Sequence, residues 1–234
     1  MSEKATDVQQ MFTAIAGKYD LLNSLLSFGR DRAWRKFAIS KCSLRPGELA
    51  LDVATGTGEV ARILAQHYSG IKIVGVDFCL EMLARARAKL ATSPDGRRIQ
   101  LIPGDALRLP FPDSTFDCVT IGFALRNVTD IASAFGEMAR VVKPGGRVVS
   151  LELTRPSSRV VRAIYYFYIF RIAPHIGGLI SGRRKAYTYL PESILEFPSP
   201  EEVKRIMTEG GLEKVETYRL TFGAATVHVG IKRG

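Results

Sequence analysis

The feature that most constrains the fold is a regular alternation of apolar runs and amphipathic segments from residue 49 onward. Five short runs rich in Val, Ile and Leu have the length and composition of buried β-strands. They cover residues 49–54, 71–77, 99–105, 116–122 and 147–153. Helical spacing of apolar residues connects several of them. Because the connections are short, the pattern predicts an α/β fold in which helices flank both faces of a parallel sheet built from right-handed βαβ units.

Two more strands are predicted near the C-terminus, over 212–220 and 225–233, after a helix at 200–209. Only four residues separate them, which favours an antiparallel hairpin. The predicted fold is therefore a doubly wound, Rossmann-like, mainly parallel seven-stranded sheet with a C-terminal antiparallel hairpin. By fold analogy this is the arrangement of class I methyltransferases. A chain of 234 residues is long enough for one such domain over 1–234.

Charge and cysteine content limit the partners and the compartment. The net charge of +10 favours an acidic partner, whether nucleic acid, an anionic membrane surface or an anionic small molecule. The three cysteines are scattered and the three histidines have no metal-ligand spacing, so we expect no disulfides, no metal and a cytoplasmic location. The N-terminus does not have the pattern of a signal peptide. No apolar run approaches the roughly 20 residues that span a bilayer.

The turn after the first predicted strand, LDVATGTGEVA at 51–61, is a candidate cofactor loop. In open α/β sheets, ligands bind at the carboxyl ends of the strands. Gly56 and Gly58 allow a ligand to approach the backbone, and the next helix offers its free N–H groups. Ala61 stands where a dinucleotide fingerprint has its third glycine. The loop alone therefore does not distinguish nucleotide binding from a tight turn.

Acidic residues near the ends of three strands add a second signal. Asp77 ends the second strand, where a carboxylate accepts hydrogen bonds from ribose hydroxyls. Asp105 follows the third strand and, with the backbone of Ala106, is placed for the edge of an adenine. Together with Asp52, these acids suit a cationic sulfonium cofactor better than a pyrophosphate, which they would repel. This argues against a nicotinamide-dependent oxidoreductase.

Over nearly its whole length the chain resembles the ubiquinone/menaquinone biosynthesis C-methyltransferases. The glycine loop and KPGG at 143–146 are shared with many methyltransferases that use S-adenosylmethionine. Three other segments are more specific to the family and occur here in order. They are KYDLLN at 18–23, FALRNVTD at 123–130 and YLPESI at 189–194.

The resemblance implies methyl transfer from S-adenosylmethionine to a ring carbon of a polyprenylated quinol, most simply demethylmenaquinol. A methoxy-benzoquinol precursor is the alternative head group, and methylation of another small molecule or of RNA is the alternative function. No nucleic-acid partner is expected, since no RNA-binding module is appended. The predicted cofactor-binding residues are Asp52, Thr55, Gly56, Thr57, Gly58, Asp77, Phe78, Asp105, Ala106 and Gly122. Some family members have serine in place of Gly122, so only the backbone can serve there in this chain.

Arg126 and Asn127 stand between a predicted strand and a predicted helix, where a turn requires neither residue type. The acceptor carbon becomes nucleophilic when the neighbouring phenol, with a pKa of about 10, loses its proton. A guanidinium cannot be the base, but it can stabilise the phenolate and orient a water that accepts the proton. We therefore expect both residues to be catalytic. The alternative is a surface arginine paired with Asp130.

The N-terminal segment 1–40 is predicted to fold over the site as a helical lid. Tyr19 and Asp20 within it are candidate catalytic residues, although a capping or solvated Asp20 fits the sequence equally well. The resemblance also implies a set of residues that contact the substrate. They are Asn23, Tyr187, Tyr189 and Ser193.

Residues 157–197 form an insertion on the substrate side of the predicted domain. Its apolar stretch at 163–170 fits either the wall of a prenyl tunnel or a packed lid helix. The basic cluster Arg183, Arg184 and Lys185 fits either an anionic lipid surface or a solvated loop. Because the expected substrate is a membrane lipid, we expect peripheral association with the inner face of a membrane. A homodimer is a further expectation.

Overall fold

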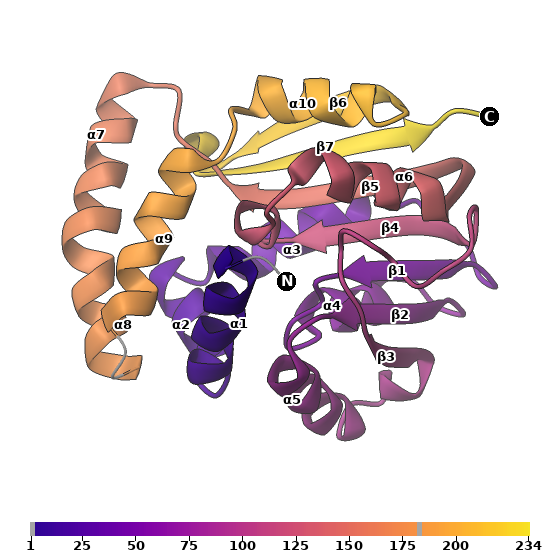
Figure 1. Cartoon of the computed structure of the whole chain (residues 1–234), viewed down its shortest axis with the longest axis horizontal. Helices are drawn as coiled ribbons and strands as arrows, with labels where there is room; N and C mark the ends of the chain where they lie inside the picture. Colours follow the sequence, from indigo (N-terminus) through magenta and orange to yellow (C-terminus); the bar gives the residue numbers. More distant parts are fainter. Residues whose placement is uncertain (1–2, 182–183) are drawn as a thin grey trace.

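In the computed structural model of the chain, residues 3–181 and 184–234 are described, without the side chains of residues 3–5, 7, 179–181 and 184–188. Seven strands form one sheet in the order β3-β2-β1-β4-β5-β7-β6 (Figure 1). The strands are β1 (Leu49–Val53), β2 (Lys72–Asp77), β3 (Ile99–Pro103), β4 (Phe116–Gly122), β5 (Val142–Leu153), β6 (Leu212–Leu220) and β7 (Ala225–Lys232). Strands β1 to β5 pair in parallel, and β7 is antiparallel to both β5 and β6. The predicted fold, including the C-terminal hairpin, is confirmed.

One strand is longer than the sequence pattern predicts. The run expected at 147–153 begins at Val142, which pairs with Phe116 before the register shifts. The KPGG segment at 143–146 is therefore an irregular start of β5. A Cβ on Gly146 would lie 2.7 Å from a backbone oxygen of β4, so the two strands approach too closely there for a side chain.

Helices cover the two faces of the sheet and bury separate apolar cores. One face carries α3 (Arg30–Ser40), α4 (Glu59–His67) and α5 (Leu80–Ala91), and the other carries α6 (Ile131–Val141) and α10 (Pro200–Glu209). Ile39 and Leu64 belong to the first core, whereas Phe135 and Met207 belong to the second. Both helices of the second face begin at a side-chain cap, Asp130 for α6 and Ser199 for α10.

The remaining helices gather at the carboxyl ends of the parallel strands (Figure 1). The N-terminal segment forms α1 (Glu3–Ile15) and α2 (Tyr19–Leu26), and the insertion forms α7 (Arg159–Phe167), the π-helical turn η3 (Tyr168–Ile172), α8 (Ala173–Ser181) and α9 (Arg184–Glu196). The two segments touch where the Tyr168 hydroxyl donates to the Leu26 carbonyl at 2.9 Å. Within the described residues, we find no helix of the length and hydropathy needed to cross a membrane.

Candidate active site

A cavity of about 320 Å³ lies at the carboxyl ends of β1 to β4, beside the point where the strand order reverses. Six of the predicted cofactor residues line it, namely Gly56, Asp77, Phe78, Asp105, Ala106 and Gly122. Val8, Phe12 and Tyr19 of α1 and α2 cover it from the N-terminal side. Among the described residues of its wall, two are carboxylates and none is Lys, Arg or His. The cavity therefore suits a cationic ligand and would repel a pyrophosphate.

Backbone groups hold the Asp77 carboxylate at the edge of this cavity. The N–H groups of Gly56 and Cys79 donate to its two oxygens at 2.7 and 2.8 Å. Gly56 has a φ of +55°, which a glycine adopts without strain. Burial raises the pKa of Asp77, while these N–H groups oppose the shift. The carboxylate is therefore fixed in position by the protein itself.

Three predicted cofactor residues belong to the glycine loop and the strand before it but do not line the cavity. Asp52 accepts hydrogen bonds from the hydroxyls of Thr55 at 2.6 Å and Thr120 at 2.8 Å. Burial raises the pKa of Asp52 to about 6. Gly58 has a φ of +76°, and a Cβ there would lie 3.3 Å from Ala86. The contacts of Asp52, Thr55 and Gly58 thus hold the loop against β4 and α5.

A smaller cavity of about 90 Å³ adjoins the first, and Phe123 lines both. Its wall combines α2, α3, α9, the loop after β4 and the α7–η3 segment, and most of its lining is apolar. Asn23 and Arg126 are the residues of this wall that the sequence predicts as site residues. Trp34 and Tyr165 also contribute to it. The smaller cavity is therefore built from segments far apart in the sequence.

The Arg126 side chain is buried against the smaller cavity and forms an ion pair with Glu152 of β5. Its guanidinium also donates to the Phe123 carbonyl at 2.8 Å, and its backbone N–H donates to Glu152 at 3.3 Å. Burial lowers the pKa of Arg126, but the Glu152 carboxylate together with Tyr19 and Tyr189 reverses this and leaves the pKa raised, so the guanidinium stays charged. Asp130 caps α6 through the Ser133 N–H instead of pairing with this arginine.

Several polar groups around Arg126 are buried without a hydrogen-bond partner among the described residues. They are the Arg126 Nε, the Asn127 Oδ1 and the Tyr189 hydroxyl. Such groups are costly to bury unless a ligand or water satisfies them. Asn127 lines the cofactor cavity, whereas Arg126 lines the smaller one. Two of the unpartnered atoms therefore belong to residues that line the two neighbouring cavities.

The two tyrosines near Arg126 have raised pKa values and are therefore poor bases. Burial raises the pKa of both Tyr165 and Tyr189, and the positive charge of Arg126 only partly offsets the shift. Both hydroxyls therefore stay protonated and can donate hydrogen bonds near neutral pH. Tyr19 lies on the cofactor side, where its ring packs edge-on against Phe12 at 5.7 Å.

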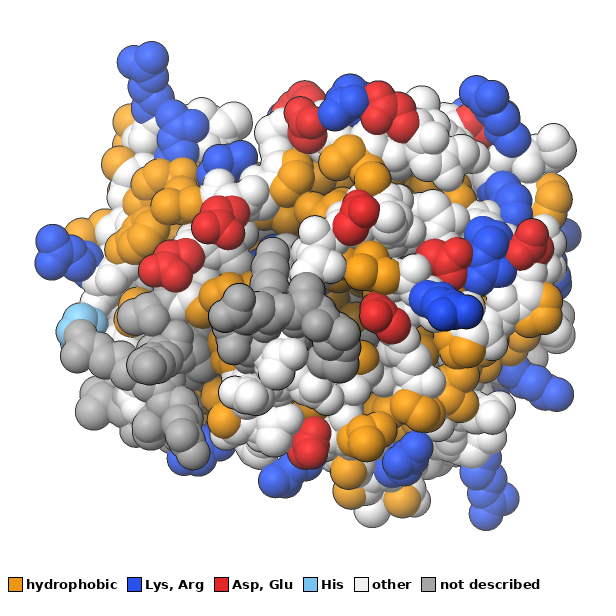
Figure 2. All heavy atoms as spheres, viewed as in Figure 1, with side chains coloured by type: hydrophobic (Ala, Val, Ile, Leu, Met, Phe, Trp, Pro, Cys, Tyr) orange, Lys and Arg blue, Asp and Glu red, His pale blue; other side chains and the backbone are white. Residues whose placement is uncertain are grey.

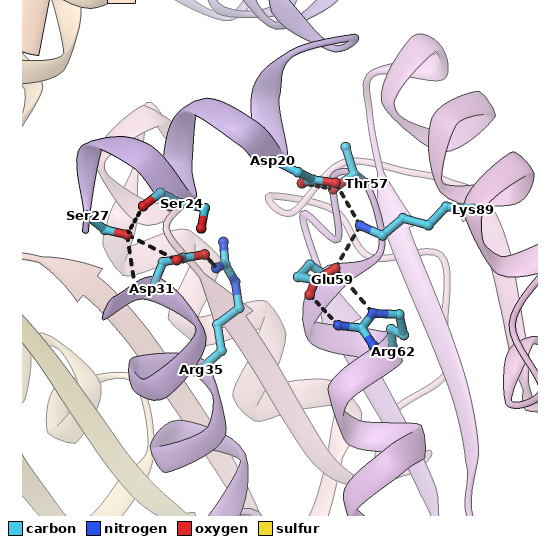
Figure 3. Close-up of polar contacts among 9 residues, drawn as sticks. All are labelled: Asp20, Ser24, Ser27, Asp31, Arg35, Thr57, Glu59, Arg62 and Lys89. Atoms are coloured by element: carbon cyan, nitrogen blue, oxygen red, sulfur yellow. Dashed lines mark hydrogen bonds and ion pairs between the residues drawn. The ribbon is translucent and has the colours of Figure 1, made fainter. Parts of the chain in front are cut away.

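Asp20 and Thr57 lie outside both cavities and join α2 to the glycine loop (Figure 3). The Thr57 hydroxyl donates to Asp20 at 2.6 Å, and Lys89 of α5 pairs with the same carboxylate at 2.7 Å. Lys89 also pairs with Glu59 at 2.7 Å. This arrangement fastens the N-terminal segment over the cofactor cavity and does not bring Asp20 to Arg126.

Two predicted substrate residues are not placed against a cavity. Ser193 is buried, and its hydroxyl donates to the carbonyl of Leu190 within α9 at 2.9 Å. The side chain of Tyr187 lies outside the described residues, as do those of the basic cluster at 183–185. Of the predicted substrate residues, Asn23 lines the smaller cavity, and Tyr189 lies close enough to Arg126 for the positive charge to act on its pKa.

Glu152 and Tyr165 are site residues that sequence reasoning missed. A signal for Glu152 was present, because it is the one acid in the largely apolar run RVVSLEL at 147–153. A buried carboxylate needs a partner, so a cation close to the end of this strand was to be expected. Tyr165 is one of four aromatic residues in succession at 165–168, and no sequence pattern shows which of them faces the site.

Comparisons with known proteins agree with this geometry. The model of the ubiE/COQ5 methyltransferase family matches residues 1–232. A ubiquinone/menaquinone biosynthesis C-methyltransferase UbiE from Geotalea uraniireducens is 47% identical over 99% of both chains. A demethylmenaquinone methyltransferase from Thermus thermophilus is 46% identical over 94% of this chain and 99% of its own.

Solved structures show the same fold at low sequence identity. The [4+2]-cyclase SpnF aligns with a TM-score of 0.71 at 17% identity, over 98% of this chain and 97% of its own. A SAM-dependent methyltransferase from Aquifex aeolicus aligns with a TM-score of 0.64 at 17% identity, over 91% and 97% of the two chains. Similarity at this level establishes the fold and leaves the reaction to be argued from the site.

Proposed function

We propose that this chain, which belongs to the ubiE/COQ5 methyltransferase family, methylates a ring carbon of a polyprenylated quinol. Membership of the family makes the chain a methyltransferase and implies S-adenosylmethionine as the methyl donor. The names of the relatives support an acceptor from quinone biosynthesis. We propose demethylmenaquinol as that acceptor, with a benzoquinol precursor as the alternative head group.

The larger cavity is the proposed cofactor site. Asp77 would accept hydrogen bonds from the ribose, and Asp105 with the Ala106 backbone would face the adenine. The glycine loop at Gly56 and the backbone of Gly122 would contact the rest of the molecule. When bound, S-adenosylmethionine supplies a methyl group that is already activated on a sulfonium. The protein therefore has to align the acceptor carbon and exclude water.

The observation that carries the proposal is a buried, charged Arg126 that lines the smaller cavity and whose Nε has no partner among the described residues. A cation in this position lowers the energy of a phenolate on the acceptor, which makes the neighbouring ring carbon nucleophilic. Glu152 keeps the guanidinium in place through two contacts, one to the side chain and one to the backbone. We assign Glu152 the role of a positioning residue.

We propose that a water oriented by Asn127 and Arg126 takes the phenol proton. The buried Asn127 Oδ1 is free to accept a hydrogen bond from that water or from the quinol hydroxyl. Tyr189, held protonated by burial, would donate to the second quinol oxygen. Tyr19 would close the site from the lid. Asp20 fits a tether of the lid better than a base, because Thr57 and Lys89 already occupy its carboxylate.

The chain is proposed to act as a single domain over 1–234, with residues 1–40 as a lid and 157–197 as the substrate-side insertion. Val8, Phe12 and Tyr19 support the first assignment, since they cover the cofactor cavity. The smaller cavity supports the second, since α7–η3 and α9 supply much of its wall.

The test is methyl transfer from labelled S-adenosylmethionine to reduced demethylmenaquinone and to a demethylated benzoquinol, assayed side by side. We expect a lipid product labelled on the ring, with the naphthoquinol preferred. Binding of S-adenosylmethionine without product from either quinol would contradict the proposed acceptor class and leave the family assignment standing.

A further inference from the structure

Positive charge is concentrated in one continuous part of this chain. Residues 153–191 contain seven of the 33 Lys and Arg residues and none of the 23 acids. This segment therefore contributes +7 of the net charge of +10 although it is about a sixth of the length. It begins after Glu152 and extends through α7, η3, α8 and most of α9. An excess of one sign over a single substructure indicates a surface for a partner of the opposite sign.

The outer side of α7 carries large apolar side chains that nothing in the described structure covers. Val160, Ile164 and Phe167 follow one another at helical spacing and are 70%, 67% and 62% exposed. Arg159 precedes this row and Arg171 follows it one turn later, and both are exposed. Figure 2 shows apolar side chains gathered over α7 with Lys and Arg side chains at the margins of the group, and acidic ones toward α9. We call Val160, Ile164 and Phe167 the α7 row.

The turn after α2 extends this apolar surface. Phe28 is 77% exposed, and its ring centroid lies 5.3 Å from that of Tyr168 in η3. Tyr165, Tyr168 and Ile169 of the same α7–η3 segment line the smaller cavity. One helical layer therefore separates the exposed apolar surface from the proposed acceptor site.

An amphipathic helix with an apolar face and cationic margins is the usual form of a segment that lies in a membrane interface. A second copy of this chain fits the surface less well, because a two-fold interface would bring two segments of charge +7 together. An anionic bilayer complements both the apolar row and the cations. We propose that the α7 row and Phe28 dock this protein on an anionic membrane surface, with Arg159 and Arg171 meeting the lipid head groups.

The biological role of this docking rests on the proposed function, whereas the docking itself does not. If the acceptor is a membrane lipid, docking through α7 places the smaller cavity next to the bilayer, so the quinol would have a short path from the lipid to Arg126. The docking itself depends on α7, Phe28 and the charge distribution, and it is measured without any quinol.

Co-sedimentation with vesicles tests the docking. The probes are quinol-free vesicles of phosphatidylcholine alone and of phosphatidylcholine with phosphatidylglycerol in a 70:30 ratio. We expect the full chain to sediment with the anionic vesicles and to be released by high salt. The double variant Ile164→Glu/Phe167→Glu and the variant Arg159→Glu should each lower the bound fraction. The double variant should lower it by at least about tenfold, because two apolar side chains no longer insert into the bilayer.

Two control variants match these changes elsewhere on the surface. Leu80→Glu alters a comparably exposed apolar residue on α5, and Lys204→Glu reverses an exposed cation on α10. Both should bind vesicles as the parent does. Sedimentation that does not depend on phosphatidylglycerol, or that the α7 variants leave unchanged, would overturn the proposal. So would loss of self-association by the α7 variants in analytical ultracentrifugation, which would assign the surface to a second copy.

Activity on a short-chain quinol in solution separates the two hypotheses. The α7 variants should methylate it at the parental rate, because none of the changed residues lines either cavity. If no variant and no parent protein methylates any quinol, the proposed function fails while the vesicle result still decides the docking.

Discussion

The proposed cofactor side and the proposed acceptor side of this site are held together in different ways. On the cofactor side, Asp77 is fixed by backbone N–H groups of Gly56 and Cys79, and the cavity edge follows directly from strand ends. On the proposed acceptor side, Arg126, Tyr165 and Tyr189 come from three segments, and some of their polar atoms have no hydrogen-bond partner among the described residues. The cofactor half is therefore preorganised by the sheet, whereas the acceptor half depends on helices packed over it.

This difference suggests a division of labour. A cofactor can be recognised by groups that are already in position before it binds. Hydrogen bonds from the loop backbone hold Asp77 in such a position. A large lipid acceptor has to enter and leave, which favours a wall of helices that can separate. Mutations should consequently affect binding of the cofactor and turnover of the acceptor separately.

The largest effect should come from the acceptor half. Arg126→Ala should lower turnover on the order of a thousandfold, because the phenolate loses its stabilising cation. The dissociation constant for S-adenosylmethionine should change by less than about threefold. Labelled methyl transfer and calorimetric titration measure the two quantities.

Removing the Arg126 side chain alone leaves the buried Glu152 carboxylate without its ion-pair partner, which destabilises the fold by about 3–5 kcal/mol. The double variant Arg126→Met/Glu152→Met avoids this cost and should be nearly as inactive while melting closer to the parent. Unchanged turnover in either variant would exclude Arg126 from the mechanism.

The next effect concerns the sheet that supports both halves. His228 of β7 is buried, with its ring Nε2 2.9 Å from the Pro200 carbonyl, and burial lowers the pKa of His228 to about 4. In the unfolded chain its pKa is about 6.5, so the unfolded state binds the proton more tightly below that pH. Stability should therefore fall by about 3 kcal/mol as the pH drops from 6.5 to 4.

Urea unfolding of the parent and of His228→Gln over this pH range measures the effect. The variant should lack the His228 contribution, and the difference between the two proteins should shrink toward acid pH. Parent and variant must be compared at each pH, because the raised pKa of Asp52 acts in the opposite direction over the same range. Parallel curves for the two proteins would contradict the assignment.

A smaller effect is expected in the cofactor half. Asp77→Ala should weaken binding of S-adenosylmethionine by about thirtyfold, since a charged acceptor of hydrogen bonds is lost. Turnover at saturating cofactor should fall far less. Asp113→Ala, a matched change of an exposed carboxylate at 74% side-chain exposure, should leave cofactor binding unchanged. A loss of turnover without a loss of affinity would reverse the assignment of the two halves.

The smallest effect is expected where the two halves are joined. Asp20→Ala removes the contacts from α2 to Thr57 and Lys89, which are partly exposed and are therefore worth less than about 1 kcal/mol. The dissociation rate of S-adenosylmethionine should rise a few-fold in stopped-flow measurements, and Lys89→Ala should behave similarly. An effect of Asp20→Ala on turnover as large as that of Arg126→Ala would restore Asp20 as a candidate base.

The sequence by itself determined the sheet and the cofactor half. Strand periodicity and short connections prescribe the parallel order, and a strand-terminal acid such as Asp77 reaches the carboxyl edge wherever its strand is placed. The sequence does not show, however, which way each side chain points. Asp52 and Asp77 both lie near the ends of predicted strands. In the structure the Asp52 side chain is buried against Thr55, whereas the Asp77 side chain lines the cavity.

Only the tertiary structure decided the acceptor half. The pairing of Arg126 with Glu152 joins residues 26 positions apart, and Tyr168 meets Leu26 across 142 positions. No periodicity encodes such contacts, because they depend on how the helical segments pack over the strand ends. The same holds for the exposed row on α7: its apolar residues fit a buried helix equally well in the sequence, and only the packing of the neighbouring helices leaves Ile164 and Phe167 uncovered.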